Sequence, residues 1–510
     1  MKIVFAASEC APWAKTGGLA DVVGALPLAL AELGHDVTIF LPNYRTVARQ
    51  FPAAKVVIPS LTIPFTHYNR FVRILDGGRR AALASPVAVA KKSSAKKSPA
   101  KSPSASKGAV QLYLVDSPEM FDREGLYGAG VSDYADNAER FGLFSRAVIE
   151  ATKFLGVPDI VHAHDWQAAM VPVYLRSTYF FDPVLRRTPC VFSIHNAAYQ
   201  GVFPPRTTET LLLPWDMFTF QRLEQNDRLN FLKGGIVYAD MLSTVSRKYA
   251  EEIQTAEFGC GLESTIRLRA ADLAGILNGV DYAEWDPATD NFIAAHYTAG
   301  ALAGKQQCRA DLLAEFGLKD VPETTAVLGI VSRFAMQKGM DFIERIAPAL
   351  LQEDVVLVAL GSGDPHYESI MTDLARRHPQ KFRVRIGYDN PLAHKIEAGA
   401  DIFLMPSRYE PCGLNQIYSL KYGTIPVVRA TGGLDDTIDE QLLGRGNGFK
   451  FHGYDPQDFL AAIRRALAVR RIPAQWKSMM LRGMKQDFSW RASALEYVKL
   501  YERAIATRSL

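Results

Sequence analysis

The chain alternates between short apolar runs and longer amphipathic stretches. The apolar runs predict buried strands, and the stretches between them carry the helical spacing of hydrophobic positions. In the first half the predicted strands are 3–7, 36–42, 110–115, 159–161, 190–194 and 241–245, with weaker signals at 56–66 and 71–75. In the second half they are 326–331, 355–360, 382–386, 402–405 and 425–428.

Helices are predicted between these strands and at the end of the chain, including 22–33, 340–351, 456–470, 473–486 and 490–506. Alternating strands and helices are typical of the α/β class with parallel, doubly wound sheets. The 510 residues exceed one ordinary core, and the alternation is interrupted by an irregular stretch at 257–325. We therefore predict an N-terminal Rossmann-like domain over 1–256, a C-terminal Rossmann-like domain over 257–487 and a final helical segment over 488–510.

One segment departs from this pattern. Residues 84–107 contain repeated Lys-Lys and Ser-Pro units and no aromatic residue, so they cannot bury enough apolar surface to fold. They could be a basic tail for polyanions, a phosphorylated switch or a disordered insertion, and we favour the insertion. Strand signal resumes at 110, which places the insertion inside the first domain.

Composition narrows the function classes. The formal net charge of +4 falls close to neutral without the lysine cluster of 84–107, so no nucleic-acid partner is implied. The five cysteines are scattered and form no CxxC pair, which argues against a disulfide framework and against a zinc site. We expect no signal peptide, no membrane span and a cytoplasmic location.

The first strand leads into a Gly-Gly turn with a lysine, Lys15-Thr16-Gly17-Gly18, just before the first predicted helix. A helix N-terminus offers unpaired N–H groups and partial positive charge, glycines allow close approach of a ligand, and Lys15 adds a full charge. The turn could hold an anion, or it could be a plain strand-to-helix connection. It matches neither the dinucleotide fingerprint nor the P-loop.

Polar side chains also follow two later strands. His162 and His164 alternate along one strand and point the same way, so a metal site, a sugar-hydroxyl contact and a buried pair are all open; we favour the sugar contact. His195 and Asn196 follow the next strand and precede an aromatic loop with Tyr199, suited to sugar rings or to surface packing.

Besides the Lys15–Gly18 turn, two loops in the second half could bind an anion, and a loop with a carboxylate could bind hydroxyl groups. Arg333 and Lys338 flank the turn before the helix 340–351 and form a candidate anion site. Glu410 lies in the turn after the strand 402–405, where it could accept hydrogen bonds from hydroxyl groups. A Thr-Gly-Gly turn at 431–433 is a third candidate. Each loop alone could be a plain turn, but together they indicate a phosphate-containing ligand.

In order along nearly the whole chain, these motifs resemble the bacterial glycogen synthase and plant starch synthase family. The matching strings are KTGGLADV (15–22), HAHDW (162–166), HN (195–196), YQG (199–201), SR (332–333), QKG (337–339), PSR through GL (406–414) and TGGL (431–434). The resemblance implies a GT-B fold, with two facing Rossmann-like domains, an active site in the cleft between them and a last helix that returns to the first domain. It also implies transfer of glucose from ADP-glucose to the non-reducing end of an α-1,4-glucan, with retention and without a cofactor.

By the same resemblance, the catalytic residues are Glu410, Arg333, Lys338 and His162. The donor-binding residues are Lys15, Gly17, Gly18, Asn196, Cys412, Gly413, Leu414, Thr431, Gly432 and Gly433. Possible acceptor or supporting residues are Asp136, Asn137 and Tyr199.

The chemistry of these residue types fits the implied reaction. ADP leaves with growing negative charge, which fixed cations and amide dipoles stabilise selectively in the transition state. No DxD metal motif occurs, so Arg333 and Lys338 take the place of a metal in this interpretation. No carboxylate nucleophile can be nominated, and a front-face mechanism is the working hypothesis.

Two departures stand out. Tyr418 lies where many related transferases carry a ribose-binding Glu, which leaves recognition of the ribose and base unassigned, and the insertion at 84–107 is foreign to the family pattern. The alternatives are a UDP-glucose-using, phosphorylase-like or epimerase-like relative, or a catalytically silent glucan-binding protein. The sequence does not address oligomeric state.

Overall fold

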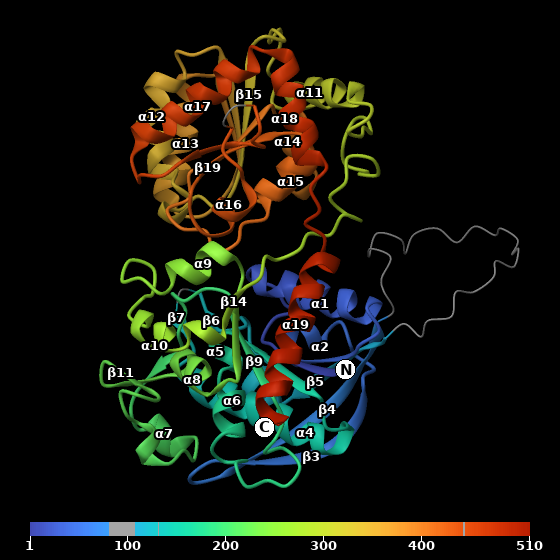
Figure 1. The fold of residues 1–510 in the computed structure, drawn as a ribbon, viewed down its shortest axis with the longest axis vertical. Helices are drawn as coiled ribbons and strands as arrows, with labels where there is room; N and C mark the ends of the chain where they lie inside the picture. The colour runs from blue at the N-terminus through green and yellow to red at the C-terminus, as the bar shows by residue number, and fades with distance from the viewer. Residues whose placement is uncertain (81–107, 131, 442–443, 510) are drawn as a thin grey trace, which may run out of the picture. The chain divides into compact units, whose positions relative to one another are not determined.

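The computed structural model describes residues 1–80, 108–130, 132–441 and 444–509, so the predicted insertion at 84–107 lies outside the described residues. The chain divides into two compact units (Figure 1). The first unit comprises 1–245, 250–279 and 490–510, and the second comprises 246–249 and 280–489. Residues 257–279 were expected in the second domain; they fall in the first unit because strand β14 (Leu273–Gly275) joins its sheet beside β13 (Met241–Thr244).

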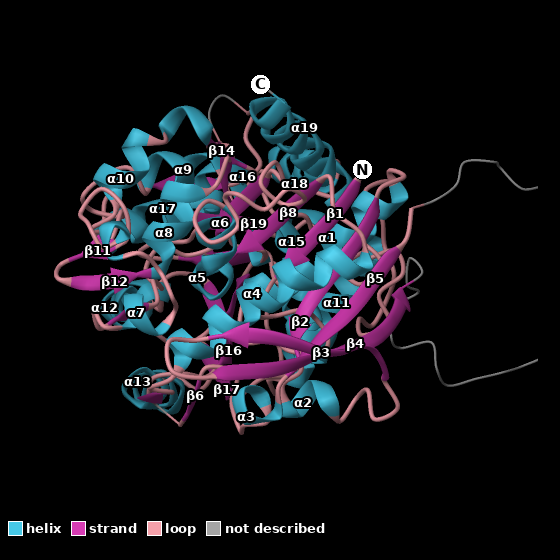
Figure 2. Cartoon of the chain, turned by 90° about the horizontal axis from the view of Figure 1, so that it is seen from below, coloured by secondary structure: helices cyan, strands magenta, loops and turns pink. Residues whose placement is uncertain are grey.

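The first unit is built on a nine-stranded sheet with the order β14-β13-β9-β8-β1-β2-β5-β4-β3. The first seven in this order pair in parallel, whereas β4 and β3 are antiparallel additions at one edge (Figure 2). The remaining strands are β1 (Lys2–Ala6), β2 (Asp36–Pro42), β3 (Lys55–Pro64), β4 (Asn69–Arg80), β5 (Val110–Asp116), β8 (Ile160–His164) and β9 (Cys190–Ile194). β4 is longer than its weak strand signal at 71–75 predicted, whereas β3 lies within two residues of its signal at 56–66.

Helices cover this sheet. The longer ones are α1 (Gly18–Glu32), α4 (Asn137–Leu155), α6 (Met170–Leu175), α8 (Phe231–Tyr238), α10 (Glu263–Leu268) and α19 (Trp490–Ser509), and short helices are α2 (Arg45–Ala48), α3 (Pro118–Phe121), α5 (Asp165–Ala168) and α7 (Thr207–Thr210). α9 (Arg247–Glu252) lies at the division between the units. The last helix, α19, packs beside α1 and against β8, β9 and β13 (Figure 1). The C-terminal residues therefore complete the core of the N-terminal unit.

The second unit has a six-stranded, all-parallel sheet with the order β17-β16-β15-β18-β19-β20. Its strands are β15 (Ala326–Val331), β16 (Val355–Gly361), β17 (Phe382–Ile386), β18 (Ile402–Met405), β19 (Ile425–Arg429) and β20 (Phe449–Phe451). Its helices are α11 (Ala303–Glu315), α12 (Met340–Leu350), α13 (Pro365–Arg377), α14 (Asn390–Gly399), α15 (Asn415–Lys421), α16 (Gly432–Thr437), α17 (Pro456–Arg470) and α18 (Pro473–Met484). The predicted α/β class with two parallel-sheet domains is confirmed.

Local sequence explains where several helices of this unit begin. The side chains of Asp364, Asp389 and Asp455 accept hydrogen bonds from backbone N–H groups in the first turns of α13, α14 and α17. Each of these helices also carries a proline in its first turn, where the missing N–H costs nothing. Asp-Pro pairs and an Asp-Asn-Pro triplet therefore fix these starts in the sequence.

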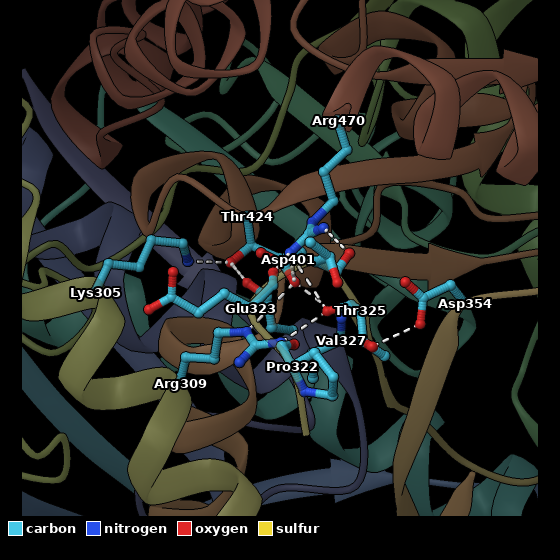
Figure 3. Close-up of polar contacts among 12 residues, drawn as sticks. Lys305, Arg309, Pro322, Glu323, Thr325, Val327, Asp354, Asp401, Thr424 and Arg470 are labelled. Carbon is cyan, nitrogen blue, oxygen red and sulfur yellow. Dashed lines mark hydrogen bonds and ion pairs between the residues drawn. The ribbon is translucent and has the colours of Figure 1, made fainter. Parts of the chain in front are cut away.

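The amino ends of the central strands in the second unit are tied together by polar groups (Figure 3). Asp401 accepts a hydrogen bond from the backbone of Val327 at 2.8 Å and pairs with Arg470 at 3.1 Å. Arg309 donates to the carbonyl of Thr325 at 2.7 Å, and the Thr325 hydroxyl donates to Asp354. Thr325, Asp354 and Asp401 immediately precede β15, β16 and β18. This edge is a structural brace, which leaves the opposite, carboxyl edge for ligands.

In the described part of the chain, no helix is long and apolar enough to cross a membrane.

Candidate active site

The second sheet reverses its strand order between β15 and β18, and the loops that follow these two strands lie side by side. In a doubly wound sheet this switch point is where ligands bind. The two loops line a cavity of about 230 Å³, whose polar lining residues are Ser332, Arg333, Lys338, Ser407, Glu410 and Asn415. Gly413 and Leu414 also line it. Five residues predicted from widely separated motifs thus meet around one cavity.

Lys338 and Glu410 form the central contact of this cavity. The Lys338 Nζ lies 2.5 Å from Glu410 Oε2, and the Ser407 hydroxyl donates to the same oxygen at 3.0 Å. The Lys338 side chain is 19% exposed and that of Glu410 is 9% exposed. Glu410 Oε1 has no hydrogen-bond partner among the described residues. One oxygen of the carboxylate is therefore fixed, and the other can accept a ligand hydrogen bond.

Arg333 lies at the rim of the cavity. It is exposed, and its guanidinium donates to the Gln337 side chain at 3.3 Å. Because this guanidinium is already exposed and makes one long hydrogen bond, it can turn toward an anion without breaking buried contacts. The pair of cations predicted before α12 is thus present, with one buried and one exposed.

The Thr-Gly-Gly turn packs on the backbone of the Glu410 loop. A Cβ on Gly432 would lie 1.9 Å from the Glu410 carbonyl oxygen, and one on Gly433 would lie 2.0 Å from the Cys412 carbonyl oxygen. Gly432 also has a φ of +46°, which favours glycine. Thr431 is 1% exposed, and Cys412 is 6% exposed. Both glycines are therefore required by close packing, and the turn supports the cavity wall.

In the first unit, the turn before α1 has a different arrangement. Lys15 is 53% exposed and pairs with Asp21 at 2.6 Å. Gly17 is the N-cap residue of α1, and its N–H donates to Glu9 at 3.1 Å. A Cβ added to Gly17 or Gly18 would meet nothing within 4 Å. Packing does not require these glycines, so the turn keeps an open side where a ligand could approach its backbone.

The ring of His162 lies in the core of the first unit. Its Nδ1 is 2.8 Å from the Tyr501 hydroxyl of α19, its Nε2 is 2.6 Å from the Ser193 hydroxyl, and the residue is fully buried. Burial lowers its pKa well below the usual value. Both ring nitrogens are engaged inside the fold, so this ring is not placed to make the sugar contact favoured from the sequence.

His164 and His195 continue the buried group. As the alternation along the strand predicts, His164 lies on the same side as His162, with ring centroids 4.0 Å apart. His164 Nδ1 is 3.1 Å from His195 Nε2, and burial lowers the pKa of His195 to about 4. The described residues include no group of three or more potential ligands placed to hold a metal ion. The arrangement is that of a neutral, buried histidine cluster.

Asp165 follows these histidines in an unusual conformation. Its φ is +53°, and its side chain accepts a hydrogen bond from the His195 backbone N–H at 2.7 Å. The Asn196 N–H also donates to it, while the Asn196 side chain accepts from Ala198. Burial, with a contribution from the charge of Glu9, raises the pKa of Asp165 to about 7. Asn196 is thus held at the carboxyl edge of the sheet by a buried carboxyl group.

The expected acceptor residues lie around the start of α4. Asp136 pairs with Arg123 at 2.5 Å, and the buried Asn137 donates to the Tyr127 carbonyl and accepts from Arg140 at 2.6 Å. Tyr199, by contrast, is 60% exposed. Asn137 is a structural anchor here, whereas the Tyr199 ring can contact a ligand.

Sequence analysis missed three residues that shape these sites: Ser407, Glu9 and Asp165. Each lies inside or beside a recognised motif, and each is buried or nearly so. A polar residue at the carboxyl end of a predicted strand, beside a candidate binding loop, was the available signal.

Family models match both halves of the chain. Residues 2–268 match the starch synthase catalytic domain, and residues 315–479 match glycosyl transferases group 1.

Relatives extend over its full length. Glycogen synthase of Koribacter versatilis is 53% identical, covering 100% of this chain and 99% of that protein. Glycogen synthase of Anaeromyxobacter dehalogenans strain 2CP-C is 46% identical, covering 98% of this chain and 99% of that protein.

Solved structures show the same architecture. The catalytic domain of starch synthase IV from Arabidopsis thaliana, bound to ADP and acarbose, superposes with a TM-score of 0.82 at 31% identity, covering 99% of each chain. Sucrose-phosphate synthase from Thermosynechococcus elongatus superposes with a TM-score of 0.56 at 17% identity, also over 99% of each chain, which indicates a shared fold alone.

Proposed function

This chain belongs to the glycogen synthase family of GT-B glycosyltransferases, and we propose that it transfers glucose from ADP-glucose to the non-reducing 4-hydroxyl of an α-1,4-glucan with retention. The observation that carries the proposal is the cavity at the switch point of the second sheet, with its Lys338–Glu410 pair and the free Oε1 of Glu410. The ADP bound to the Arabidopsis relative supports the choice of donor.

In this proposal the cations of the second unit stabilise the departing diphosphate. Lys338 is held by Glu410 in a largely buried setting, where a charge interacts more strongly than in water. Arg333 can fold over a phosphate oxygen from the rim. Because these charges are in place before the reaction, they stabilise the negative charge that develops on ADP.

Glu410 positions the glucose. Its free Oε1 accepts a sugar hydroxyl, and the backbone of Cys412, Gly413 and Leu414 contributes further polar groups on the cavity wall. The Thr431–Gly433 turn would lie near the distal phosphate. Among the residues lining this cavity, Glu410 alone carries a carboxylate, and its Oε2 is already bound by Lys338 and Ser407. This favours front-face transfer over a covalent intermediate on Glu410.

The first unit supplies a second set of donor and acceptor contacts. Lys15 and the open side of the Gly17-Gly18 turn are proposed for the diphosphate, and the His162 carbonyl and Asn196 for the sugar. The glucan acceptor is proposed to contact the region of Asp136, Asn137 and the exposed ring of Tyr199, since aromatic faces suit sugar rings.

Tyr388 is a candidate for the base, which sequence analysis left unassigned. It follows the carboxyl end of β17 and is 86% exposed, with a hydroxyl 3.2 Å from the Asn390 side chain. An exposed aromatic ring at the ligand edge of the sheet can stack on a nucleobase of either kind. Stacking alone would not distinguish ADP-glucose from UDP-glucose.

We further propose a cytoplasmic enzyme that works without a cofactor or metal. All five cysteines are free thiols, as a reducing compartment would keep them.

A single assay tests the function. Purified protein is incubated with glycogen and either ADP-glucose or UDP-glucose, without divalent metal, and the released nucleotide is measured. We expect release from ADP-glucose. Release from UDP-glucose alone would reassign the donor, and no release from either, beside an active control enzyme, would favour a silent glucan-binding protein.

A further inference from the structure

A buried carboxylate lies beneath the Gly-Gly turn of the first unit. Glu9 follows β1 and is 4% exposed. Its Oε2 accepts the backbone N–H of Thr16 at 2.6 Å and that of Gly17 at 3.1 Å, while its Oε1 accepts the Thr16 hydroxyl at 2.5 Å. Glu9 Oε1 also accepts the Tyr127 hydroxyl at 2.7 Å. All four donors are neutral, so hydrogen bonds alone compensate the burial of this charge.

These contacts divide the turn into two sides. The inner side, with the N–H groups of Thr16 and Gly17, is occupied by Glu9 and cannot bind a phosphate at the same time. The outer side carries Lys15 and the open faces of Gly17 and Gly18. Glu9 therefore fixes the shape of the turn from the side that no ligand reaches.

Tyr127 extends the same network toward α4. Its hydroxyl donates to Glu9, and its carbonyl accepts the side-chain N–H of Asn137 at 2.9 Å. Asn137 in turn accepts from Arg140, which is fully buried. One continuous chain of hydrogen bonds thus runs from the turn before α1 to the first residue of α4.

We propose that Glu9 is a positioning residue that holds the Lys15–Gly18 turn for the donor diphosphate and, through Tyr127, aligns it with the acceptor segment at the start of α4. This inference rests on the proposed function, in which the turn binds the donor and the segment contacts the glucan. Glu9 itself touches neither substrate.

The donor arm of the test uses Glu9→Gln and the pair Thr16→Val and Thr16→Ser. The glutamine keeps the size of Glu9 but loses its charge and turns an NH₂ group toward donors. We expect the KM for ADP-glucose to rise about tenfold or more, because hydrogen bonds to a charged group are worth about 1.5–3 kcal/mol. Thr16→Val removes one hydroxyl donor and should raise the same KM well above that of Thr16→Ser, which keeps it.

The acceptor arm uses Tyr127→Phe. It removes the hydroxyl that binds Glu9, while the Tyr127 carbonyl still accepts from Asn137. Because this uncouples the turn from the α4 segment, it should raise the KM for a maltooligosaccharide as well as the KM for ADP-glucose. A purely structural role would move neither KM selectively, but would lower the unfolding temperature alone. Glu32→Gln, an exposed substitution on α1, is the matched control.

The outcomes separate this inference from the function itself. Active Glu9→Gln protein with an unchanged donor KM overturns the inference and leaves the function standing. If Glu9→Gln does not fold, the threonine pair decides, and equal donor KM values for Thr16→Val and Thr16→Ser overturn it. A wild-type protein without transferase activity would refute the function instead.

Discussion

Each unit pairs a cation from the loop after its first strand with a carboxylate, but in different ways. In the second unit, Lys338 and Glu410 come from loops after two different strands and are largely buried. In the first unit, Lys15 lies in the turn before α1 and Asp21 in α1 itself, and they are 53% and 33% exposed. The first pair is a consequence of tertiary folding, and the second is a local surface pair.

This difference sets how each cation can be used. An exposed ion pair is worth about 0–1 kcal/mol, so a ligand can draw Lys15 away from Asp21 at little cost. A buried pair is fixed, because separating it leaves a desolvated charge. The second unit thus offers a preorganised charge, and the first offers an adaptable one.

The largest expected effect comes from breaking the buried pair. Lys338→Ala should lower kcat by about two to three orders of magnitude, since losing a buried, charge-assisted contact to the departing phosphate costs about 2–5 kcal/mol. Arg333→Ala should also lower turnover by orders of magnitude, through the phosphate contact alone. Nucleotide release at saturating donor and glycogen measures both, with the exposed Arg376→Ala as control. Turnover near wild type in either variant would refute its assigned role.

A second prediction concerns Asp165, a buried carboxyl group that lies near the charge of Glu9. The pKa of Asp165 is about 7 in the folded protein and about 3.9 in an unfolded chain. The folded state therefore binds the proton more tightly, and this contribution to stability is present at low pH and is lost as pH rises from about 4 to about 7. Asp165→Asn should remove that component.

The measurement is the urea midpoint of both proteins across this pH range. The stability of wild type relative to the variant should fall as pH rises and level off above pH 7. Comparing the two proteins cancels the opposite trend from the buried histidines, whose lowered pKa values cost stability as pH falls. Parallel pH profiles would show that Asp165 does not titrate there.

The adaptable cation should matter less than the fixed one. Lys15→Ala is expected to lower kcat/KM for ADP-glucose by about tenfold, since Lys15 starts from an exposed pair and acts as a mobile point charge. Steady-state kinetics at varied donor concentration measure it. A loss equal to that of Lys338→Ala would mean that the two units are equally preorganised.

The smallest effect is on stability. Tyr501→Phe removes the hydroxyl that binds His162 and should cost about 1 kcal/mol, the usual value of one buried hydrogen bond. The urea midpoint measures it, beside Leu495→Ala, an exposed change on the same helix. An unchanged midpoint would show that α19 does not need this contact to pack.

Strand-end reasoning predicted much of the second unit's site. Lys338 and Glu410 are 72 residues apart, yet both follow apolar runs of one parallel sheet, and the sheet brings such ends together. Their mutual pairing was not predicted, because strand order is not contained in local patterns. The helix α11 (Ala303–Glu315) was also not predicted, because its few apolar residues are scattered among polar ones and give no clear helical pattern.

The His162 ring shows where sequence reasoning ends. Its position on a strand and the side it faces follow from alternation along β8. What fills the space on that side depends on Tyr501, 339 residues later, and on Ser193 of a neighbouring strand. The sequence motif therefore suggested that the His162 ring is free to contact substrate, whereas in the structure the ring is buried and hydrogen-bonded to Tyr501 and Ser193.

The place of α19 in the first unit has a consequence for synthesis on the ribosome. In the sequence, nearly all of the second unit comes between residues 279 and 490 of the first. The last helix supplies Tyr501 to the histidine cluster and Arg508 to Asp240. Because the chain emerges N-terminus first, the surface of the first unit that α19 covers stays exposed until α19 has been synthesised. A chain that stops before Trp490 would leave that surface uncovered. Termination at any point before α19 would therefore expose part of the N-terminal core to chaperones and proteases.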